Sequence, residues 1–226
     1  MIDWTPLILT FKLAVITTVI LFFISLPISY WLAYTRSKLK PVVETFVSMP
    51  LVLPPTVIGF YMLLAFSPEN AFGGMIDRFL GLRLIFSFEG LVLGSLIYSL
   101  PFMVHPIQSG FANLSPSLKN ASYSIGKSKF TTLFRVLLPN IKSSVLTGVV
   151  LAFAHTIGEF GVVLMIGGNL SGKTKVASIA IYDQVEAMDY QAANTYSMIL
   201  FAITFVILML VYLINGGYFR KSVNHD

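Results

Sequence analysis

One stretch of the sequence, residues 113–142, reads NLSPSLKNASYSIGKSKFTTLFRVLLPNIK and interrupts an otherwise apolar chain with polar and basic residues. Ser115 suits the N-cap of a short helix, because the proline that follows it fits the first helical position. Gly126 suits the left-handed residue that closes this helix, and Ser128 suits the N-cap of a second helix that must end near the next proline. Residues 115–139 are therefore predicted to form a helix, a bend and a second helix.

The composition is that of an integral membrane protein. Hydrophobic residues make up 56% of the 226 residues, charged residues only 11%, and the mean hydropathy is positive. The chain has no cysteine, which excludes disulfides and thiolate metal sites. The formal charge of +5 does not indicate a nucleic-acid partner, because the basic residues cluster beside apolar segments instead of alternating with stacking aromatics. We therefore expect an all-α membrane protein.

Apolar segments long enough to cross about 30 Å of hydrocarbon as helices recur along the chain. The candidate spans are residues 7–34, 42–66, 90–111, 143–166 and 192–218, about five transmembrane helices in a single membrane domain over 1–226. The second span contains Pro54 and Pro55, and irregular backbone persists at membrane depth only where protein or a water-filled cavity satisfies it. These two prolines are therefore candidates for a transport pathway. Residues 67–89 are predicted to form a loop with a short amphipathic helix.

Basic residues predict the orientation, since Lys and Arg concentrate on the cytoplasmic side of a membrane. Three follow the first span, five lie in the stretch 113–142, and two, Arg220 and Lys221, lie in the C-terminal tail. The opposite side carries five basic residues diluted by acidic ones. We therefore expect a multi-pass protein in contact with the lipid of a prokaryotic inner membrane, with its N-terminus outside and its C-terminus in the cytoplasm.

The charge of residues 115–139 is compatible with a solvated cytoplasmic loop, but their spacing is more specific. It resembles the coupling motif of ATP-binding-cassette (ABC) importer permeases, which reads E-A-A, three residues, G, nine residues, I-x-L-P. The glycine and the nine-residue gap match, whereas the glutamate and the second alanine are replaced. We call residues 115–139 the coupling segment, because the resemblance implies that it docks into a cleft of a cytosolic ATPase. The residues carried over to this contact are Asn120, Ala121, Ser122, Gly126, Leu138 and Pro139.

Further stretches extend the resemblance over nearly the whole chain. They are PLVLPPTVIG from Pro50, GEFG from Gly158, GNLSGKT from Gly168, Ile181-Tyr182 and YQAA from Tyr190. Together they look like the molybdate permease subunit of ABC importers, a type I transmembrane domain. Sulfate permeases share the GEFG stretch while the double proline favours molybdate, so tungstate and sulfate carriers stay open as alternatives. The resemblance implies a homodimeric channel, two copies of a cytosolic ATPase that bind ATP and magnesium, and an extracytoplasmic oxyanion-binding protein.

Residues 167–174, GGNLSGKT, fit the P-loop pattern letter for letter. A P-loop requires a preceding strand and a following helix, whereas here a membrane span precedes the loop and the charge count places it outside. We expect no nucleotide at this loop. It is either a glycine-rich nest that meets an anion at the outer mouth or a plain exposed turn. The candidates for the nest are Asn169, Gly172, Lys173 and Thr174.

The fourth span carries His155 and Glu159, whose spacing would place them on one helical face. A carboxylate at membrane depth is unfavourable unless it is paired, hydrogen-bonded, protonated or hydrated, so Glu159 is a gate candidate with His155 as its nearest partner in sequence. The alternative is that the pair only ties this span to its neighbours. A dianion also needs a polar path, which one thin chain cannot enclose, so two copies are expected to face each other. Candidates for lining the path are Ser95, Ser99, Thr147, Thr156, Asn194 and Ser197.

Other function classes find little support in the sequence. No Ser/His/Asp, Cys/His or multi-carboxylate cluster lies at a useful spacing, so we expect neither enzymatic activity, nor a metal site, nor a cofactor in this chain. A secondary transporter driven by an ion gradient is the remaining alternative. It is expected to show inverted repeats and paired broken helices, whereas this sequence is interrupted by a single basic segment.

Overall fold

The computed structural model describes residues 2–215, and within this range the secondary structure is entirely helical. Three helices are long and apolar enough to cross a membrane, namely α1 (Thr5–Tyr34), α5 (Phe88–Ala112) and α12 (Tyr190–Asn215), and the number rises to five if each bent helix pair counts as one. The predicted all-α membrane fold is thus confirmed. The last part of the fifth candidate span, 216–218, and the basic pair Arg220 and Lys221 lie outside the described residues.

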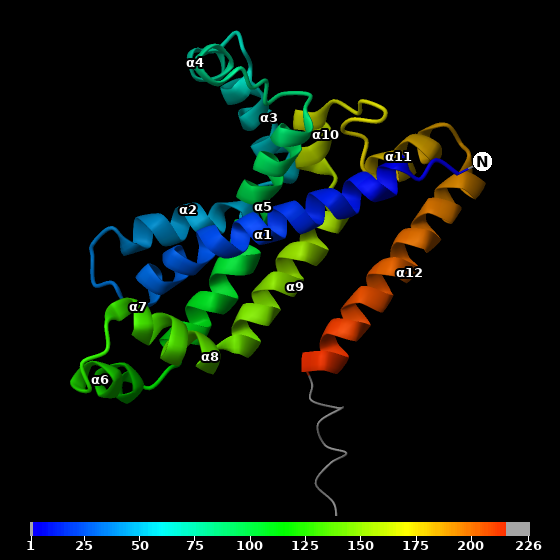
Figure 1. The fold of residues 1–226 in the computed structure, drawn as a ribbon. Coiled ribbons are helices and arrows are strands. Elements are labelled where there is room, and N and C mark those ends of the chain that lie inside the picture. Colours follow the sequence, from blue (N-terminus) through cyan, green and yellow to red (C-terminus); the bar gives the residue numbers. More distant parts are fainter. Residues whose placement is uncertain (1, 216–226) are drawn as a thin grey trace, which may run out of the picture.

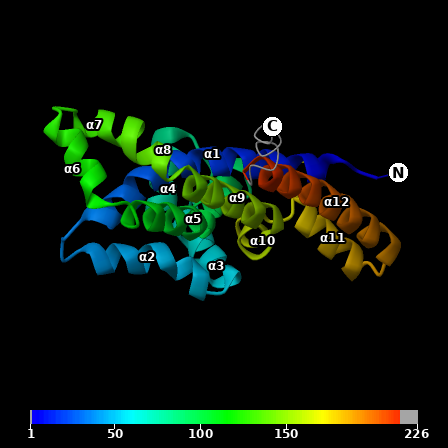
Figure 2. The same cartoon turned by 90° about the horizontal axis from the view of Figure 1, so that it is seen from below.

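The long helices pack as a bundle. In Figure 1, α1 crosses α5 and α9 (Lys142–Gly158), and the residue contacts confirm that these three helices pack on one another. Figure 2 shows α12 beside α11 (Ala177–Glu186), and α12 also contacts α9. Because lipid is as apolar as leucine, close packing rather than transfer from water stabilises such a bundle.

The second candidate span is bent sharply. Helices α2 (Lys40–Val52) and α3 (Pro55–Phe66) meet at 115°. Leu53 and Pro54 are extended there, because a residue that precedes proline is driven away from helical backbone angles. The predicted break at the double proline is confirmed.

The fourth candidate span is also broken, which the sequence analysis did not predict. Helix α9 ends at Gly158, Glu159 is extended with φ −70° and ψ 136°, and a short helix α10 runs over Gly161–Gly167. Residues 143–166 are therefore not one helix. The break has no proline, so its cause lies in the contacts of Glu159 described below.

The two breaks meet each other. A Cβ atom on Gly161 would lie 2.6 Å from Pro55 Cβ, and one on Gly59 would lie 2.7 Å from Met165 Cβ. Real Cβ atoms do not approach so closely, so glycine permits α3 and α10 to cross in contact. On the side of this crossing away from the coupling segment, Leu91, Val162 and Ile166 are among the buried residues of one apolar core.

A second apolar core joins the coupling segment to the bundle. Leu21 of α1 and Met103 and Ile107 of α5 are buried together with Leu137 and Ile141. The coupling segment itself consists of α6 (Pro116–Ser124), α7 (Lys129–Thr132), the π-helical turn η1 (Leu133–Leu137) and α8 (Leu138–Asn140). It is therefore fixed to α1 and α5.

The predicted local structure of the coupling segment is confirmed. Ser115 Oγ accepts a hydrogen bond from the N–H of Ser117, and Ser128 Oγ accepts one from the N–H of Thr131. Gly126 adopts φ 75°, the left-handed conformation expected at the bend.

At the other end of the bundle lies α4 (Ala71–Leu80), the short helix predicted between the second and third spans. It follows α3 after a short link, and a second link leads to Ser87, which caps α5 by accepting a hydrogen bond from the N–H of Gly90.

Candidate functional site

The two helix breaks and α5 border a hollow of about 470 Å³. Its lining comes from the start of α3, the middle of α5 and the break between α9 and α10. The lining residues are Pro55, Thr56, Tyr98, Ala154, His155, Gly158, Glu159, Phe160 and Gly161. Three of the predicted pathway residues, Pro55, His155 and Glu159, are thus brought together. Pro54 lies next to them at the bend.

Glu159 is 5% exposed, and its side chain caps the start of α10 from the position before the N-cap residue Phe160. Its Oε1 accepts hydrogen bonds from the N–H groups of Val162 (2.9 Å) and Val163 (3.3 Å), which have no partner in the first turn of the helix. Ser95 Oγ donates to Oε2 at 3.4 Å, and Ser178 Oγ donates to the Glu159 carbonyl at 2.6 Å. The positive end of the α10 dipole also favours a carboxylate here. The break in the fourth span therefore provides the groups that satisfy the buried Glu159.

His155 is not the partner of Glu159, contrary to the expectation from their spacing. Helix α9 ends between them, so they do not share a helical face, and within residues 2–215 no ion pair joins them. Instead His155 Nδ1 lies 2.9 Å from Ser99 Oγ, and the imidazole stacks on Phe102 with 4.0 Å between ring centroids. The imidazole is therefore held against α5.

The predicted path-lining residues fall into two groups. Ser95, Ser99 and Thr156 are buried between α5 and α9, where Ser99 Oγ lies 3.1 Å from Thr156 Oγ1. The others bond to their own helix instead: Thr147 to Ser143, Ser197 to Ala193, and Asn194 to Met198. None of the six lines the hollow, whose polar lining side chains are Thr56, Tyr98, His155 and Glu159. The structure thus places the polar line on α5 and the end of α9.

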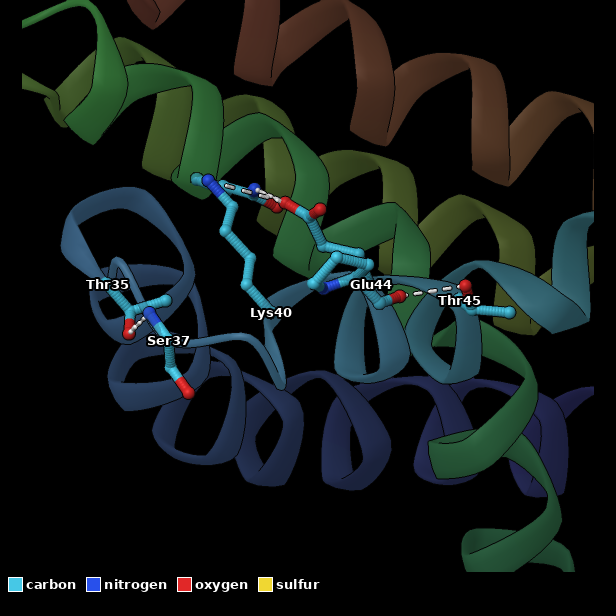
Figure 3. Close-up of polar contacts among 7 residues, drawn as sticks. Thr35, Ser37, Lys40, Glu44 and Thr45 are labelled. Carbon is cyan, nitrogen blue, oxygen red and sulfur yellow. Dashed lines mark hydrogen bonds and ion pairs between the residues drawn. The ribbon is translucent and has the colours of Figure 1, made fainter.

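A second polar cluster lies between α2 and α5 and was missed in the sequence. Gln108 Nε2 donates to Glu44 Oε1 at 2.7 Å, and Lys40 Nζ lies 3.8 Å from the same oxygen. One turn further along, Ser48 Oγ lies 3.1 Å from His105 Nε2. Figure 3 shows Lys40 and Glu44 on α2 beside α5. Glu44 and Ser48 also line a hollow of about 540 Å³ along α2, together with apolar side chains such as Met49 and Val52.

The coupling residues carried over from the motif take different positions. Asn120, Ala121 and Gly126 are exposed on the outer surface of the segment. Ser122 is buried, and its Oγ lies 2.8 Å from Thr132 Oγ1, so it ties the two halves of the segment together. Leu138 is half-buried, and the neighbouring Pro139 is exposed.

Three apolar side chains that the motif does not include lie at the exposed tip. Ile125 is 71% exposed and Phe130 72%, and the ring of Phe134 lies tilted beside that of Phe130 with 4.4 Å between ring centroids. Lys119 points the other way and lies over the Tyr34 ring of α1, with Nζ 4.2 Å from its centroid. The segment thus has an attached side and a free apolar side.

The glycine-rich loop of residues 167–174 is not a P-loop. Thr174 is fully buried, its hydroxyl donates to the Gly167 carbonyl at 2.7 Å and accepts from the N–H of Leu170 at 2.9 Å. The hydroxyl that a P-loop offers to magnesium is therefore used within the loop, and helix α10 rather than a strand precedes it. Asn169 is also engaged, donating to Asp183 at 2.9 Å. Of the candidates for an anion nest, Gly172 and Lys173 are exposed.

The chain consists of apolar helices, two of its helix breaks meet at a hollow, and a two-helix polar segment lies at one end. This is the architecture of a membrane permease. Among residues 2–215 no group of three or more acidic or histidine side chains is placed to hold a metal ion. The chain belongs to the family described as binding-protein-dependent transport system inner membrane component, which matches residues 25–225. The resemblance to ABC importer permeases is thus confirmed.

Individual relatives agree with this family. The chain is 43% identical over 213 residues to the molybdenum transport system permease protein ModB of Azotobacter vinelandii, with 93% of each chain covered. It is 31% identical over 202 residues to the probable sulfate transport system permease protein cysT of Zygnema circumcarinatum, which covers 89% of this chain and 70% of that one. Its fold is similar to a solved structure of the MetNI methionine ABC transporter in inward-facing conformations, with a TM-score of 0.73, 16% identity and 92% of both chains covered.

The family also settles one expectation from the sequence. Paired broken helices were expected to mark a transporter driven by an ion gradient, yet this member of the importer family has both breaks. Broken helices therefore do not separate the two classes here. In either class, irregular backbone at membrane depth is tolerated where it is buried in protein or lines a water-filled cavity.

Proposed function

We propose that this chain is the membrane-spanning permease subunit of an ATP-driven importer that carries molybdate into the cytoplasm. The observation that carries this proposal is the polar line formed where the two helix breaks meet. The imidazole of His155 lines the hollow there, and the buried hydroxyl groups of Ser95, Ser99 and Thr156 lie behind it. Thr56, Tyr98 and His155, which line the hollow, carry hydroxyl or imidazole N–H groups of the kind that donate to a tetrahedral oxyanion.

Tungstate and sulfate are the alternative cargoes. The relative named for molybdenum has a higher sequence identity to this chain than the one named for sulfate. The match also covers 93% of the molybdenum relative but only 70% of the sulfate relative. Both observations support molybdate. Tungstate has the same charge and shape, so it is expected to compete for the same path.

The proposed path requires a second copy of the chain. The hollow between the breaks is open on one side, and a single bundle cannot shield a dianion from lipid. We propose a homodimer whose spans are α1, α2 with α3, α5, α9 with α10, and α12. The charge count supports the N-terminus outside and the coupling segment in the cytoplasm.

Energy is proposed to come from a separate ATPase that binds ATP and magnesium and docks on the coupling segment. The exposed apolar tip formed by Ile125, Phe130 and Phe134 suits insertion into a cleft, and the basic side chains of Lys127 and Lys129 flank it. An extracytoplasmic binding protein is proposed to deliver the oxyanion to the opposite end. The chain itself is not proposed to hydrolyse ATP.

Reconstitution tests this function. The chain is purified with its ATPase and binding protein, placed in proteoliposomes, and assayed for ATP-dependent uptake of molybdate in competition with tungstate and sulfate. Ser99→Val is expected to lower molybdate uptake about tenfold, because the buried hydroxyl that positions the His155 imidazole at the hollow is lost. Thr147→Val is the matched control, since Thr147 is exposed and bonds only to its own helix. Uptake driven by an ion gradient without ATP would contradict the proposal.

A further inference from the structure

Helix α4 exposes a continuous apolar stripe. Phe72, Met75 and Phe79 follow one another at helical spacing and are 51%, 49% and 82% exposed. Asp77 projects from the opposite side of the helix and Arg78 lies along the edge of the stripe beside Met75, because successive residues are 100° apart. The helix is therefore amphipathic, and its apolar side is the side that faces away from the protein.

The orientation of α4 is fixed by its own backbone. Gly73 is buried, and a Cβ atom there would overlap the Ser67 carbonyl oxygen. A Cβ atom on Gly74 would lie 2.7 Å from the Pro68 carbonyl oxygen. The two glycines therefore hold this helix against the end of α3, and it cannot rotate to bury its apolar stripe.

The position of α4 suits a membrane surface. Figure 1 shows it nearly end-on, whereas α1, α5, α9 and α12 extend along the picture, so it runs across the direction of the proposed spans. Phe72 contacts Phe66 in the last turn of α3, with 5.7 Å between ring centroids. The apolar stripe thus begins where a proposed span ends, and the links on both sides keep it at that depth.

We propose that α4 is an interfacial helix embedded in the bilayer surface. Phe72, Met75 and Phe79 lie among the ends of the lipid headgroups and the first acyl carbons, and Arg78 faces the lipid phosphates. Amphipathic helices with aromatic residues on one side and basic residues on the other bind in this way. The short links to α3 and α5 raise the local concentration of the helix at the surface, so ten residues suffice. The leaflet follows from the proposed orientation and is the outer one.

The lipid contact is tested with brominated lipids, which quench tryptophan fluorescence at known depths. Trp4 and Trp31 are first replaced by phenylalanine in the full chain, which is assembled with its ATPase in nanodiscs containing an anionic lipid. Phe79→Trp is compared with Asp77→Trp on the opposite side of the same helix. Lipids brominated near the headgroup are expected to quench the stripe variant about twofold more strongly than the control. Met75→Trp is a second stripe variant in case the first does not assemble.

Each other outcome overturns the proposal. Equal quenching of Phe79→Trp and Asp77→Trp would show that α4 has no side that faces the lipid preferentially. Disulfide formation between copies carrying Phe79→Cys, together with weak quenching of the stripe variants, would assign the stripe to a second copy of the chain. Quenching that disappears when the binding protein is added would assign it to that partner. Because the readout is lipid proximity and not uptake, it is independent of the proposed cargo.

Discussion

Replacing Glu159 tests whether its carboxylate acts as a helix cap. Glu159→Ala removes the acceptor for the N–H groups of Val162 and Val163 and the partner of Ser95, all of which are buried. Loss of an N-cap costs about 0.5–2 kcal/mol and each buried polar group left unsatisfied about 1–3 kcal/mol, so a total loss of about 2–4 kcal/mol is expected after partial relaxation. The amide oxygen of Glu159→Gln can still accept both backbone hydrogen bonds. It is expected to lose only the charge–dipole part, about 0.3–1 kcal/mol.

The midpoint of thermal unfolding in detergent measures this difference, followed by the fluorescence of the two native tryptophans. At about 2–4 °C per kcal/mol, Glu159→Ala is expected to lower the midpoint by roughly 4–16 °C. Glu159→Gln is expected to lower it by less than half as much and to retain most uptake. Glu89, an exposed carboxylate in the first turn of α5, provides the matched Ala and Gln controls.

Two results would refute the reasoning about Glu159. If the Gln variant is as unstable as the Ala variant, the charge matters and the acceptor does not. If neither variant changes the midpoint more than the corresponding Glu89 variant, the cap contributes nothing to stability. A stable Gln variant without uptake would instead assign the charge to transport.

Four further predictions concern the helix crossing, the coupling segment, the topology and the outer loop. Gly161→Leu is expected to lower uptake at least about tenfold, because the side chain would overlap Pro55 and overpacking costs about 1–3 kcal/mol; unchanged uptake would contradict a close crossing of α3 and α10. Gly126→Trp is expected to abolish substrate-stimulated ATP hydrolysis by the complex while the chain still inserts, and Gly81→Trp, at an equally open left-handed glycine just after α4, should leave hydrolysis intact. Ser128→Cys is expected to react with an impermeant thiol reagent only in inverted vesicles, since the native chain has no cysteine, and labelling from outside in intact cells would reverse the topology. Lys173→Ala is expected to leave the nucleotide affinity of the ATPase unchanged, and a tenfold loss, about 1.4 kcal/mol, would restore the P-loop interpretation.

Local chemistry made much of the fold predictable. The caps at Ser115 and Ser128 and the left-handed Gly126 each act within a few residues, so the sequence contains all the atoms involved. The bend at Pro54 and Pro55 is of the same kind, because proline restricts the backbone of its neighbour directly.

The second break was not predictable in the same way. The apolar run 143–166 has no proline and reads as one span. The structure ends α9 at Gly158 because Glu159 turns back to cap α10 and Gly161 approaches Pro55, a contact between residues over a hundred positions apart. The predicted pairing of His155 with Glu159 was wrong for this reason, because the prediction assumed a continuous helix.

The polar cluster around Glu44 shows a related limit. A lone carboxylate near the start of an apolar segment is visible in the sequence, but its partner Gln108 lies 64 positions away on α5. The exposed tip of the coupling segment is similar, because periodicity alone does not show which side of so short a helix is attached to the bundle. The exposure of Ile125 and Phe130 is therefore visible only in the packed structure.

The crossing of α3 and α10 constrains how the permease moves. Glycine meets the facing helix at Gly59 and at Gly161, so the two helices touch backbone to side chain with no room to slide. Each is linked to the rest of its broken span by an extended residue, Pro54 on one side and Glu159 on the other. Two helices that are in fixed contact with each other and linked at their ends by extended residues must move together. A movement of the coupling segment would therefore rotate α3 and α10 together as one rigid body. The pathway would then open and close by a single movement.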